Sequence, residues 1–285
     1  ENSGSTITLT ATISGVTDSA VTVALSTSGT ATEGTDYGTI SDITISAGAT
    51  TGTATLDPTD DNVYEGDETA IIDISGVSGK SGVTENSTQQ VSVTISENES
   101  EPTVTLATSA TSIAENAGTS LTLTATLSVA TTADVTVALS TSGTATEGTD
   151  YTDGSGNIDD IVISAGSTTG TVSFTPTDDS LYDATSNETA TIAISGVSGG
   201  SASESGTQSV TITITDNESA PTVTLATSGT SIAENSASTL TITATLSVAT
   251  YQDVTVSIGS SGTATEGTDY GTVSDITISA GSTTG

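Results

Sequence analysis

Apolar and polar residues alternate with a period of two through most of the chain. Val, Ile, Leu or Ala occupy one set of positions, and mostly Thr or Ser the other, in the segments 6–13 (TITLTATI), 21–25 (VTVAL), 53–56 (TATL), 69–74 (TAIIDI) and 91–95 (VSVTI). Successive side chains of a strand point to opposite faces of its sheet, so this pattern predicts half-buried β-strands. No apolar pattern of period 3.6, which would indicate an amphipathic helix, persists for three turns.

Clusters of Gly, Ser, Asp and Asn separate the predicted strands about every 8 to 15 residues, and such clusters are typical of turns. About seven short strands fall within roughly 115 residues, as in an antiparallel β-sandwich. The hydrophobic content is 32%, with one Phe and no Trp, which is enough for modest cores built mainly from small and β-branched residues. The sequence therefore predicts an all-β protein.

One turn sequence is repeated without change. The ten residues SGTATEGTDY occur at 28–37, 142–151 and 261–270. A second pair of segments, ENESEPTVTL at 97–106 and DNESAPTVTL at 216–225, has the same spacing of 119 residues as the last two copies of the turn. Internal similarity at such a spacing indicates several copies of one domain.

These repeats predict three units. Residues 1–101 form a unit that lacks its first strand, residues 102–219 form a complete unit, and residues 220–285 form the first half of a third. The partial ends have two explanations: the chain is a window of a longer array, or neighbouring molecules complete the ends strand for strand. Residues 234–285 duplicate the content of residues 1–52, so the two ends overlap and do not complement each other. A longer array is the favoured interpretation.

The charge balance restricts the possible partners. The chain has 35 acidic residues and a single basic one, Lys80, for a formal net charge of −34. Phosphate binding needs clustered Lys and Arg, so we expect no nucleic-acid partner. Docking on anionic lipid also needs basic residues, and no run of 18 apolar residues occurs, so we expect no direct membrane insertion. The natural partners of such a chain are cations.

Cysteine, histidine, methionine and tryptophan are all absent. Without Cys or His the chain has no thiol nucleophile, no Ser/His/Asp triad, no usual zinc site and no disulfide framework. We therefore expect that it is not an enzyme.

Many carboxylates stand at predicted strand ends and in loops. In the first unit these are Glu1, Asp36, Asp60, Asp61, Glu65, Glu68, Glu97 and Glu99. The matching positions of the second unit hold Glu115, Asp150, Asp178, Asp179, Asp183, Glu188, Asp216 and Glu218. Strand ends gather at the two poles of a sandwich, so several of these loops are expected to meet at one tip.

Carboxylates that meet in this way need a positive partner. Two of them ~4 Å apart repel each other by about 1 kcal/mol in water and by about 4 kcal/mol at the effective dielectric of a protein surface. Calcium accepts 6 to 8 oxygen ligands in adaptable geometry and needs neither nitrogen nor sulfur. Magnesium prefers stricter octahedra, and the softer metals lack their ligands in this chain. Ca²⁺ is therefore the expected cofactor.

Four motifs together resemble one known family. DDNVYEGDE (60–68), GTATEGTDY (29–37), AEN (114–116) and the terminal SENE (96–99), or TDNE in the next copy, resemble the Calx-beta domain of sodium/calcium exchangers and many bacterial surface proteins. The resemblance covers the whole chain in one complete and two partial copies. It implies an immunoglobulin-like antiparallel sandwich whose calcium-binding members hold their ions in loops at one end.

The resemblance also implies a ligand set. In each of the first two units the candidates are the eight acids named above, joined by the backbone carbonyl of Val63 in the first unit and of Leu181 in the second. The third unit stops before its acidic loop and retains only Glu234 and Asp269. The loop DDSLYDATSNE of the second unit is two residues longer than DDNVYEGDE, so we expect fewer or weaker ions there.

Other readings of the same residues stay open. The repeated turn is also explained by backbone geometry alone, with Gly29 and Gly34 supplying unusual angles and Tyr37 covering the core. The acidic loops can simply keep a long array soluble. Asp60 and Asp61 can form a hydrolytic pair, although the chain lacks the aromatic residues of a sugar-binding cleft.

The arrangement of the units suggests a mechanical role. Glu97 and Glu99 directly precede the strand expected at 102–106, so a metal bound there would stiffen the joint between two units. Repetition of such joints gives an extended rod. We therefore expect a secreted or cell-surface structural or adhesive protein, a stalk or filament segment of a large bacterial surface protein. Its partners would be neighbouring repeats, with lateral or end-to-end self-association into fibres.

Two functions of other classes remain alternatives. A ligand- or glycan-recognition module would bind through loops at the tip, but recognition usually relies on exposed aromatic or Arg anchors, and the chain has no Arg. Tyr37, Tyr151 and Tyr270 recur at one repeat position and are better interpreted as structural. A calcium-sensing regulatory module would be expected in one or two copies and not in an array.

Overall fold

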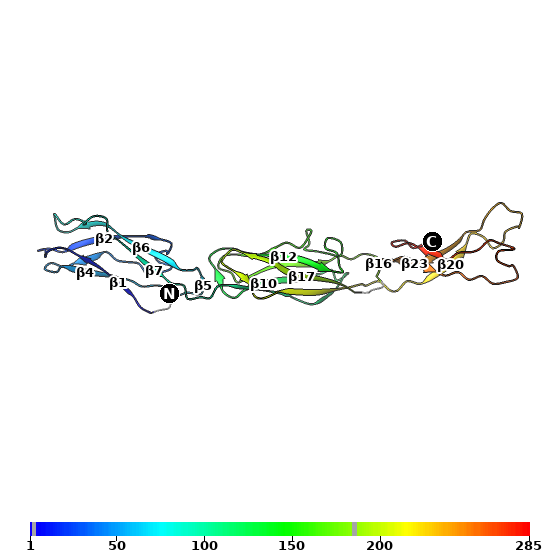
Figure 1. Ribbon diagram of the computed structural model, residues 1–285, viewed down its shortest axis with the longest axis horizontal. Coiled ribbons are helices and arrows are strands. Elements are labelled where there is room, and N and C mark those ends of the chain that lie inside the picture. The colour runs from blue at the N-terminus through cyan, green and yellow to red at the C-terminus, as the bar shows by residue number, and fades with distance from the viewer. Residues whose placement is uncertain (2–3, 184–186) are drawn as a thin grey trace.

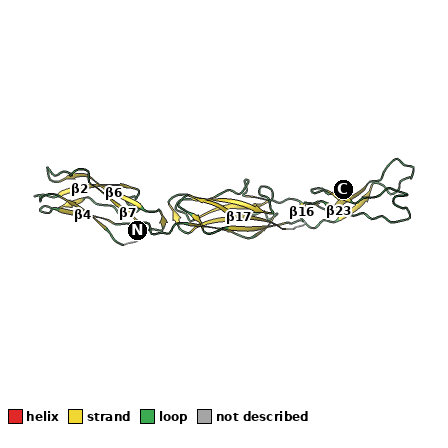
Figure 2. Ribbon diagram, viewed as in Figure 1, coloured by secondary structure: helices red, strands yellow, loops and turns green. Residues whose placement is uncertain are grey.

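The protein is an extended row of three β-structured bodies. The computed structural model describes residue 1, residues 4–183 and residues 187–285. All regular elements in these residues are β-strands, and Figure 2 shows only strands and loops. The three bodies follow one another along the long axis of the molecule (Figure 1). We refer to residues 1–101, 102–219 and 220–285 as the first, second and third units.

The second unit is a sandwich of two five-stranded sheets. One sheet has the order β13 (Tyr151–Thr152), β15 (Thr169–Pro176), β10 (Leu121–Leu127), β8 (Thr103–Thr108), β18 (Ser203–Glu204). The other has the order β14 (Ile161–Ile163), β12 (Val135–Gly143), β17 (Asn187–Ser198), β19 (Ser209–Thr215), β9 (Ser112–Ala114). Most pairs are antiparallel, but β18 with β8 and β9 with β19 run parallel.

The core of the second unit lies between these sheets. Its fully buried side chains alternate with outward Thr and Ser along the strands, as the period of two predicts; they include Leu123, Val135, Ile161, Phe174, Ile192 and Ile212. The ring of Tyr151 stacks on that of Phe174, with their centroids 4.7 Å apart. Burial of each large aliphatic side chain contributes about 1.5–3 kcal/mol, so the sandwich is held mainly by these residues.

The first unit repeats this plan with fewer strands. Its two sheets contain β1 (Ile7–Thr12) with β4 (Thr51–Leu56), and β3 (Ile43–Ile45), β2 (Val21–Gly29), β6 (Glu68–Ser78) and β7 (Gln90–Ile95). All five strand segments expected from the sequence are confirmed. Strands β2 and β6 run several residues further than expected, because the continuation of each strand pairs with the expected part of the other. No counterpart of β8 or β9 occurs among the described residues of this unit.

The third unit has a small core. It contains two antiparallel pairs, β20 (Val223–Thr227) with β21 (Ile242–Leu246) and β23 (Val254–Val256) with β24 (Ile276–Ile278). Leu225 is 57% exposed, whereas its counterpart Leu106 in the second unit is 7% exposed. The difference arises because residues 220–285 include no counterparts of β17 and β19, the strands of the facing sheet that contact β8.

The repeated turn SGTATEGTDY is built around a glutamate. The Glu33 carboxylate accepts hydrogen bonds from the N–H of Ile40 (3.0 Å) and the hydroxyl of Thr27 (2.8 Å). Glu147 makes the same pair of bonds in the second unit, to Ile158 (2.6 Å) and Thr141 (2.8 Å). The glutamate therefore closes the loop that follows β2 or β12, and this structural use explains part of the repeat.

The units are joined by short parallel β-pairs. In the first joint β5 (Val63–Tyr64) pairs with β11 (Ala130–Thr131), and in the second β16 (Leu181–Tyr182) pairs with β22 (Ala249–Thr250). In the second joint the N–H of Tyr251 also donates to the carbonyl of Tyr182 (3.1 Å). These pairs were not expected from the sequence. Two-residue strands inside an acidic loop have no alternation that would reveal them.

A glycine at the end of β12 gives a first test of the fold. Gly143 has φ of +126°, and a Cβ there would lie 2.0 Å from the carbonyl oxygen of Thr189. Gly143→Ala should destabilise the second unit by about 1–3 kcal/mol, because it adds both strain and a clash with backbone. Calorimetric melting would show this as a lower Tm, by about 4 °C or more for a domain of this size.

Gly196→Ala is the matched control. Gly196 lies in the partner strand β17, and its added Cβ would meet only the Ala138 side chain at 4.0 Å. We expect an unchanged or slightly raised Tm, because alanine restricts the unfolded chain more than glycine does. Equal losses in both variants would contradict the importance of the Gly143 conformation.

Candidate metal centre

One acidic cluster of the first unit combines three segments of the chain. Asp36 is the last acidic residue of the repeated turn, Glu65 follows β5 directly, and Glu68 begins β6. One carboxylate oxygen from each lies within 4.8 Å of the others. Asp36 is 7% exposed, and its Oδ2 accepts the N–H of Thr32 (2.5 Å). The turn therefore orients Asp36 toward the loop that forms the joint. We call this group the inner cluster.

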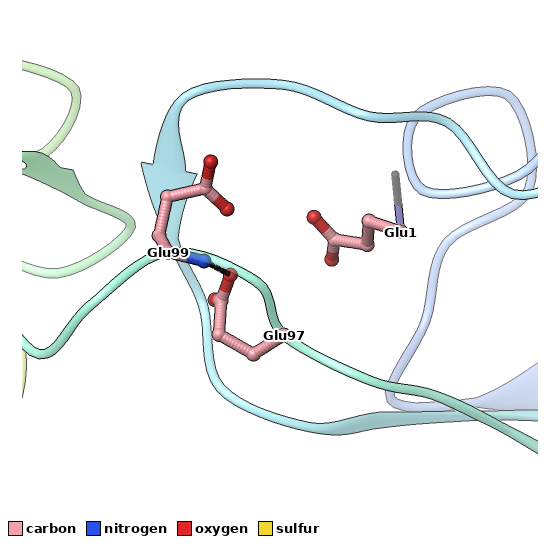
Figure 3. A group of neighbouring side chains, drawn as sticks. All are labelled: Glu1, Glu97 and Glu99. Atoms are coloured by element: carbon pink, nitrogen blue, oxygen red, sulfur yellow. Dashed lines mark hydrogen bonds between the residues drawn. The ribbon is translucent and has the colours of Figure 1, made fainter. Parts of the chain in front are cut away.

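A second cluster lies beside it at the end of the unit. It consists of Glu1, Glu97 and Glu99, and Figure 3 shows their three carboxyl groups directed toward a shared space. Glu97 is held by backbone donors: its carboxylate accepts the N–H groups of Glu65 (2.6 Å), Gly66 (2.8 Å) and Glu99 (2.9 Å). We call this group the linker cluster, because Glu97 and Glu99 lie in the linker to the second unit.

The second unit has a corresponding cluster. Glu115 follows β9, Asp179 precedes β16, and Glu218 follows β19; their ligand atoms again lie within 4.8 Å of one another. Glu115 and Asp179 of this cluster also line a small cavity, whose other acidic lining residues are Asp150, Asp183, Glu188 and Asp216. Tyr251 of the third unit also lines it. This cavity therefore lies at the joint between the second and third units.

Each cluster contains one carboxylate oxygen without a partner. Within the described part of the chain, three buried side-chain oxygens make no hydrogen bond, and they are the Oε2 atoms of Glu68, Glu99 and Glu218. One belongs to each cluster. A buried acceptor left unsatisfied costs about 1–3 kcal/mol, and more when it is charged. A cation among these oxygens would satisfy them.

The donor atoms fit a hard cation. They are carboxylate oxygens brought together from two or three segments of the chain, with no nitrogen or sulfur ligand in these groups. Calcium takes this kind of oxygen set, and its coordination tolerates the irregular spacing of loop residues. The residues that would hold it are those of the three clusters, with Asp150, Asp183, Glu188 and Asp216 available around the cavity.

The electrostatics of the clusters favour proton or metal binding. Burial, followed by repulsion from Glu97, raises the pKa of Glu1 to about 7. Burial, followed by repulsion from Asp36 and Glu68, raises the pKa of Glu65 to about 7. In the second unit, burial and a hydrogen bond with Glu218 raise the pKa of Glu115 to about 8. These groups resist ionisation because no basic residue neutralises them.

Glu97 behaves in the opposite way. Burial opposes its ionisation, but the N–H groups of Glu65, Glu99 and Gly66 outweigh burial and lower the pKa of Glu97 to about 2. A carboxylate that accepts several backbone N–H bonds is strongly stabilised in its charged form. Glu97 is therefore a permanent negative charge at the centre of the linker cluster.

Some predicted ligands lie outside the clusters. Asp60, Asp61 and Asp178 are exposed, and the carboxylate of Asp61 accepts the N–H of Val63 (2.7 Å). Asp179 accepts the N–H of Leu181 in the same way (2.7 Å) while also belonging to a cluster. Asp61 and Asp179 therefore shape the start of the joint strands β5 and β16.

The two predicted carbonyl ligands belong to the joint strands β5 and β16. The carbonyl of Tyr182 accepts the N–H of Tyr251 across the joint, and adjacent strand residues turn their carbonyls to opposite sides. The carbonyl of Leu181 therefore points away from β22, and Leu181 itself lines the acidic cavity. Val63 has the equivalent position in β5, paired with Ala130.

The third unit contributes little. Glu234 and Asp269 are exposed and belong to no group of three metal-ligating side chains in the described part of the chain. The Asp269 carboxylate accepts the N–H of Thr265 (2.7 Å), as Asp36 does with Thr32. The turn therefore forms without the acidic loop that would complete the site.

Sequence reasoning missed two contributors. Asp67 accepts the N–H of Glu97 (3.0 Å) and so positions the linker cluster. Tyr251 closes the cavity of the second unit from the third. Asp67 has no special signal beside Glu65 and Glu68, and Tyr251 belongs to a different repeat, so neither was predictable from motif spacing.

The match to known families follows the same repeat pattern. The model of the Calx-beta domain matches the chain three times, over residues 1–99, 97–218 and 216–278. The chain belongs to the Calx-beta family. It consists of three tandem Calx-beta domains, which are not catalytic modules, and the expected all-β sandwich class is confirmed.

Two solved structures resemble the Calx-beta chain. A crystal structure of CBD12 from CALX1.2 is 17% identical, with a TM-score of 0.32, and the similarity covers 75% of this chain and 94% of that one. A crystal structure of the calcium binding domain CBD12 of CALX1.1 is 18% identical, with a TM-score of 0.30, and covers 69% and 75%. The comparison with curated proteins gave no match. Family membership therefore rests on the domain matches.

A pair of neighbouring glutamates tests the linker cluster. Glu99→Gln should lower the number of calcium ions bound by about one, because it removes the carboxylate that carries the unpartnered oxygen. Glu101→Gln makes the same charge change two residues away, at an exposed residue outside every cluster, and should leave the number unchanged. Isothermal titration calorimetry on the whole chain measures both. If both variants lost the same number of bound calcium ions, the acidic residues would attract calcium only as a diffuse layer of counterions and not at a defined site.

The raised pKa values predict an unusual pH dependence of folding stability in the absence of metal. Glu1, Glu65 and Glu115 have pKa values of about 7, 7 and 8, against an ordinary value of 4.5 for glutamate. Between the ordinary and the raised pKa values, the folded state binds more protons than the unfolded state. Stability should therefore rise as pH falls from about 8 to about 5. Below that range the lowered pKa of Glu97 acts in the opposite direction, and stability should fall.

Melting temperatures in metal-free buffer at pH 5, 6, 7 and 8 would check this dependence. Saturating calcium should reverse the slope, because lower pH then protonates the ligands and weakens metal binding. A Tm that is flat in metal-free buffer would show that the clustered carboxylates are fully solvated.

Proposed function

We propose that the chain is a segment of an extracellular stalk or filament whose joints are stiffened by calcium. The stalk would belong to a large bacterial surface protein with a structural or adhesive role. The observation that carries this proposal is that the acidic loops are themselves the joints. Glu65 follows β5 directly, and β5 pairs with β11 of the next unit.

The loop that carries the acidic residues also carries the strand that forms the joint. The N–H groups of Glu65 and Gly66 are bonded to Glu97 of the linker, so the loop and the linker move as one piece. A cation in the inner cluster would fix Glu65, and through it the preceding Tyr64, which pairs with Thr131. Repulsion between unneutralised carboxylates would instead push these segments apart.

The second joint has the same construction. Asp183 follows β16, and its N–H donates to the Asp216 carboxylate (2.8 Å) just after β19. The paired strand β22 brings Tyr251 to the edge of the acidic cavity. Repetition of one joint in a chain of similar units favours a rod of regular shape over a set of independent modules.

We expect bound calcium to add a modest free energy of stabilisation. Extracellular modules bind calcium with Kd values of about 10⁻⁴–10⁻³ M. A site with free calcium at ten times its Kd adds about 1.4 kcal/mol by mass action. The described clusters would therefore add a few kcal/mol along the rod, comparable to the repulsion they remove.

The first unit also presents an exposed joint surface. Val16 and Thr17 occupy the repeat positions of Ala130 and Thr131, and the Thr17 hydroxyl bonds the Ser19 carbonyl (2.8 Å) as Thr131 bonds Ala133 (2.7 Å). Val16 is 67% exposed, whereas Ala130 is 9% exposed beneath β5. We assign Val16–Thr17 as the docking edge for a neighbouring unit of the same kind.

The extracellular setting rests on chemistry. Cys and Met, the main oxidation targets, are absent, which suits a long-lived structure outside the cell. Millimolar calcium, which such sites need, is found outside cells. The described residues include no helix long and apolar enough to span a membrane.

Small-angle X-ray scattering of the whole chain tests the proposal. With millimolar calcium we expect a long, narrow distance distribution, and after chelation a shorter and broader one. Circular dichroism should show little change, because each core is held by apolar burial and not by metal. Sodium at equal ionic strength only screens the charges and should not restore the length.

Three results would count against the stiffened stalk. An unchanged maximum dimension on chelation would show that the joints are rigid without metal. Simultaneous loss of β structure would show that metal holds the sandwich itself. Recovery of the maximum dimension in sodium alone would show that the acidic residues only keep the protein soluble.

A further inference from the structure

The strands through which the chain enters and leaves the second unit are paired with each other. The chain enters through β8 and β9 and leaves through β19. Strands β9 and β19 run parallel, with Ser112, Ile113 and Ala114 opposite Thr213, Ile214 and Thr215. This pair is not part of any cluster or joint described above.

Several backbone bonds connect these end strands. The N–H of Thr213 donates to the Thr111 carbonyl (3.0 Å), and the N–H of Glu115 donates to the Thr215 carbonyl (3.1 Å). The entering strand is also bonded to the segment around β18, which precedes β19: the N–H of Ser203 donates to the Pro102 carbonyl (3.0 Å). The entering segment is therefore held along its length and not at a single point.

The two chain ends leave this pair at opposite poles. Pro102 follows the linker from the first unit, whereas Thr215 and Glu218 precede the linker to the third unit. The three units follow one another along the long axis of the molecule (Figure 1). Tension along the rod therefore pulls β8 and β9 toward one pole and β19 toward the other. The parallel strands are then displaced along their own axes.

The direction of pull determines the resistance. When two paired strands slide along their axes, all the bonds between them must break together. When strands are peeled apart from one end, the bonds break one after another. Forced unfolding is governed by the unfolding rate, so the first geometry has the higher barrier and the higher unfolding force.

We propose that the β9/β19 pair is a tensile clamp that lets a complete unit withstand stretching along the rod. This function depends on the proposed role as a stalk, since only a tethered stalk is stretched along its axis. It requires that β9 and β19 carry the tension directly, so that the remaining strands are shielded until the pair separates.

The cluster of the second unit lies at the end of the clamp. Glu115 follows β9 and Glu218 follows β19, and their ligand atoms lie within 4.8 Å of each other. A cation held between them would link the same two strands that the tension separates. Calcium is therefore expected to raise the unfolding force, while the backbone pairing provides resistance without it.

Single-molecule pulling in two directions tests the clamp on one folded protein. The chain has no cysteine, so engineered pairs give unique attachment points. Glu101→Cys with Ser219→Cys loads the second unit along the rod and shears the clamp. Ala117→Cys with Ser219→Cys pulls from one pole, where all these residues are exposed, and peels the clamp open. We expect the first geometry to need a several-fold higher force.

Two proline variants locate the resistance within β19. Thr213→Pro removes a donor of the clamp and should lower the force in the shear geometry. Thr211→Pro removes an N–H on the same side of the strand but before β9 begins, where proline is tolerated, and should have little effect. Circular dichroism of both variants reports whether the unit still folds. If Thr213→Pro does not fold, the comparison of the two pulling directions decides the proposal.

Measurements in chelator and in calcium separate this proposal from the stiffened stalk. Higher force in the shear geometry under both conditions supports the clamp. Equal forces in the two directions would overturn it, even if scattering shows calcium-dependent length. Unequal forces with no calcium effect on length would leave the clamp standing and remove the calcium-stiffened joint.

Discussion

Repulsion among carboxylates that no basic residue neutralises is the constraint on which the rest of the structure depends. The one lysine, Lys80, pairs with Asp18 (2.6 Å) at the surface of the first unit and belongs to no cluster. The protein nevertheless gathers its acids where its units meet. Backbone N–H groups compensate part of the charge, most clearly at Glu97, while among the described residues one buried oxygen each of Glu68, Glu99 and Glu218 stays unpartnered. The fold thus tolerates a local instability at each joint that a cation can remove.

The sandwiches can carry this instability because their cores are independent of it. The buried residues of the first two units form separate apolar clusters, each made from alternating positions of several strands. Burial of Leu56 or Ile161 does not depend on the state of the joint loops, which lie at the poles of the sandwiches. Changes in charge at the ends therefore alter how units are oriented before they alter whether units fold.

Much of the fold was predictable from the sequence, and the reason is periodicity. A strand such as β10 alternates buried and outward residues, so its character is visible in LTLTATL. The gathering of Asp36 with Glu65 and Glu68 was also predictable, because acids at strand ends of a sandwich meet at a pole. Sequence and structure agree wherever a rule of local geometry determines the position.

Other features depend on contacts between distant segments and have no local signal. Glu33 and Asp36 stand three residues apart in one acidic turn, yet Glu33 braces the loop at Ile40 while Asp36 faces the cluster. Asp61 appears a stronger ligand candidate than Asp67 in sequence, but Asp61 caps Val63 and Asp67 holds Glu97. The roles of these acids are decided by which backbone donor lies nearby, and that is known only when the chain is folded.

The joints also bear on how such a protein changes length over generations. Pairing between β5 and β11, and between β16 and β22, uses backbone groups, so Val-Tyr in one joint and Leu-Tyr in the other meet the same Ala-Thr edge. An interface formed by backbone pairing does not depend on particular side chains, so any neighbouring unit with the same fold can form it. Units can then be duplicated, deleted or reordered, and each new junction still fits.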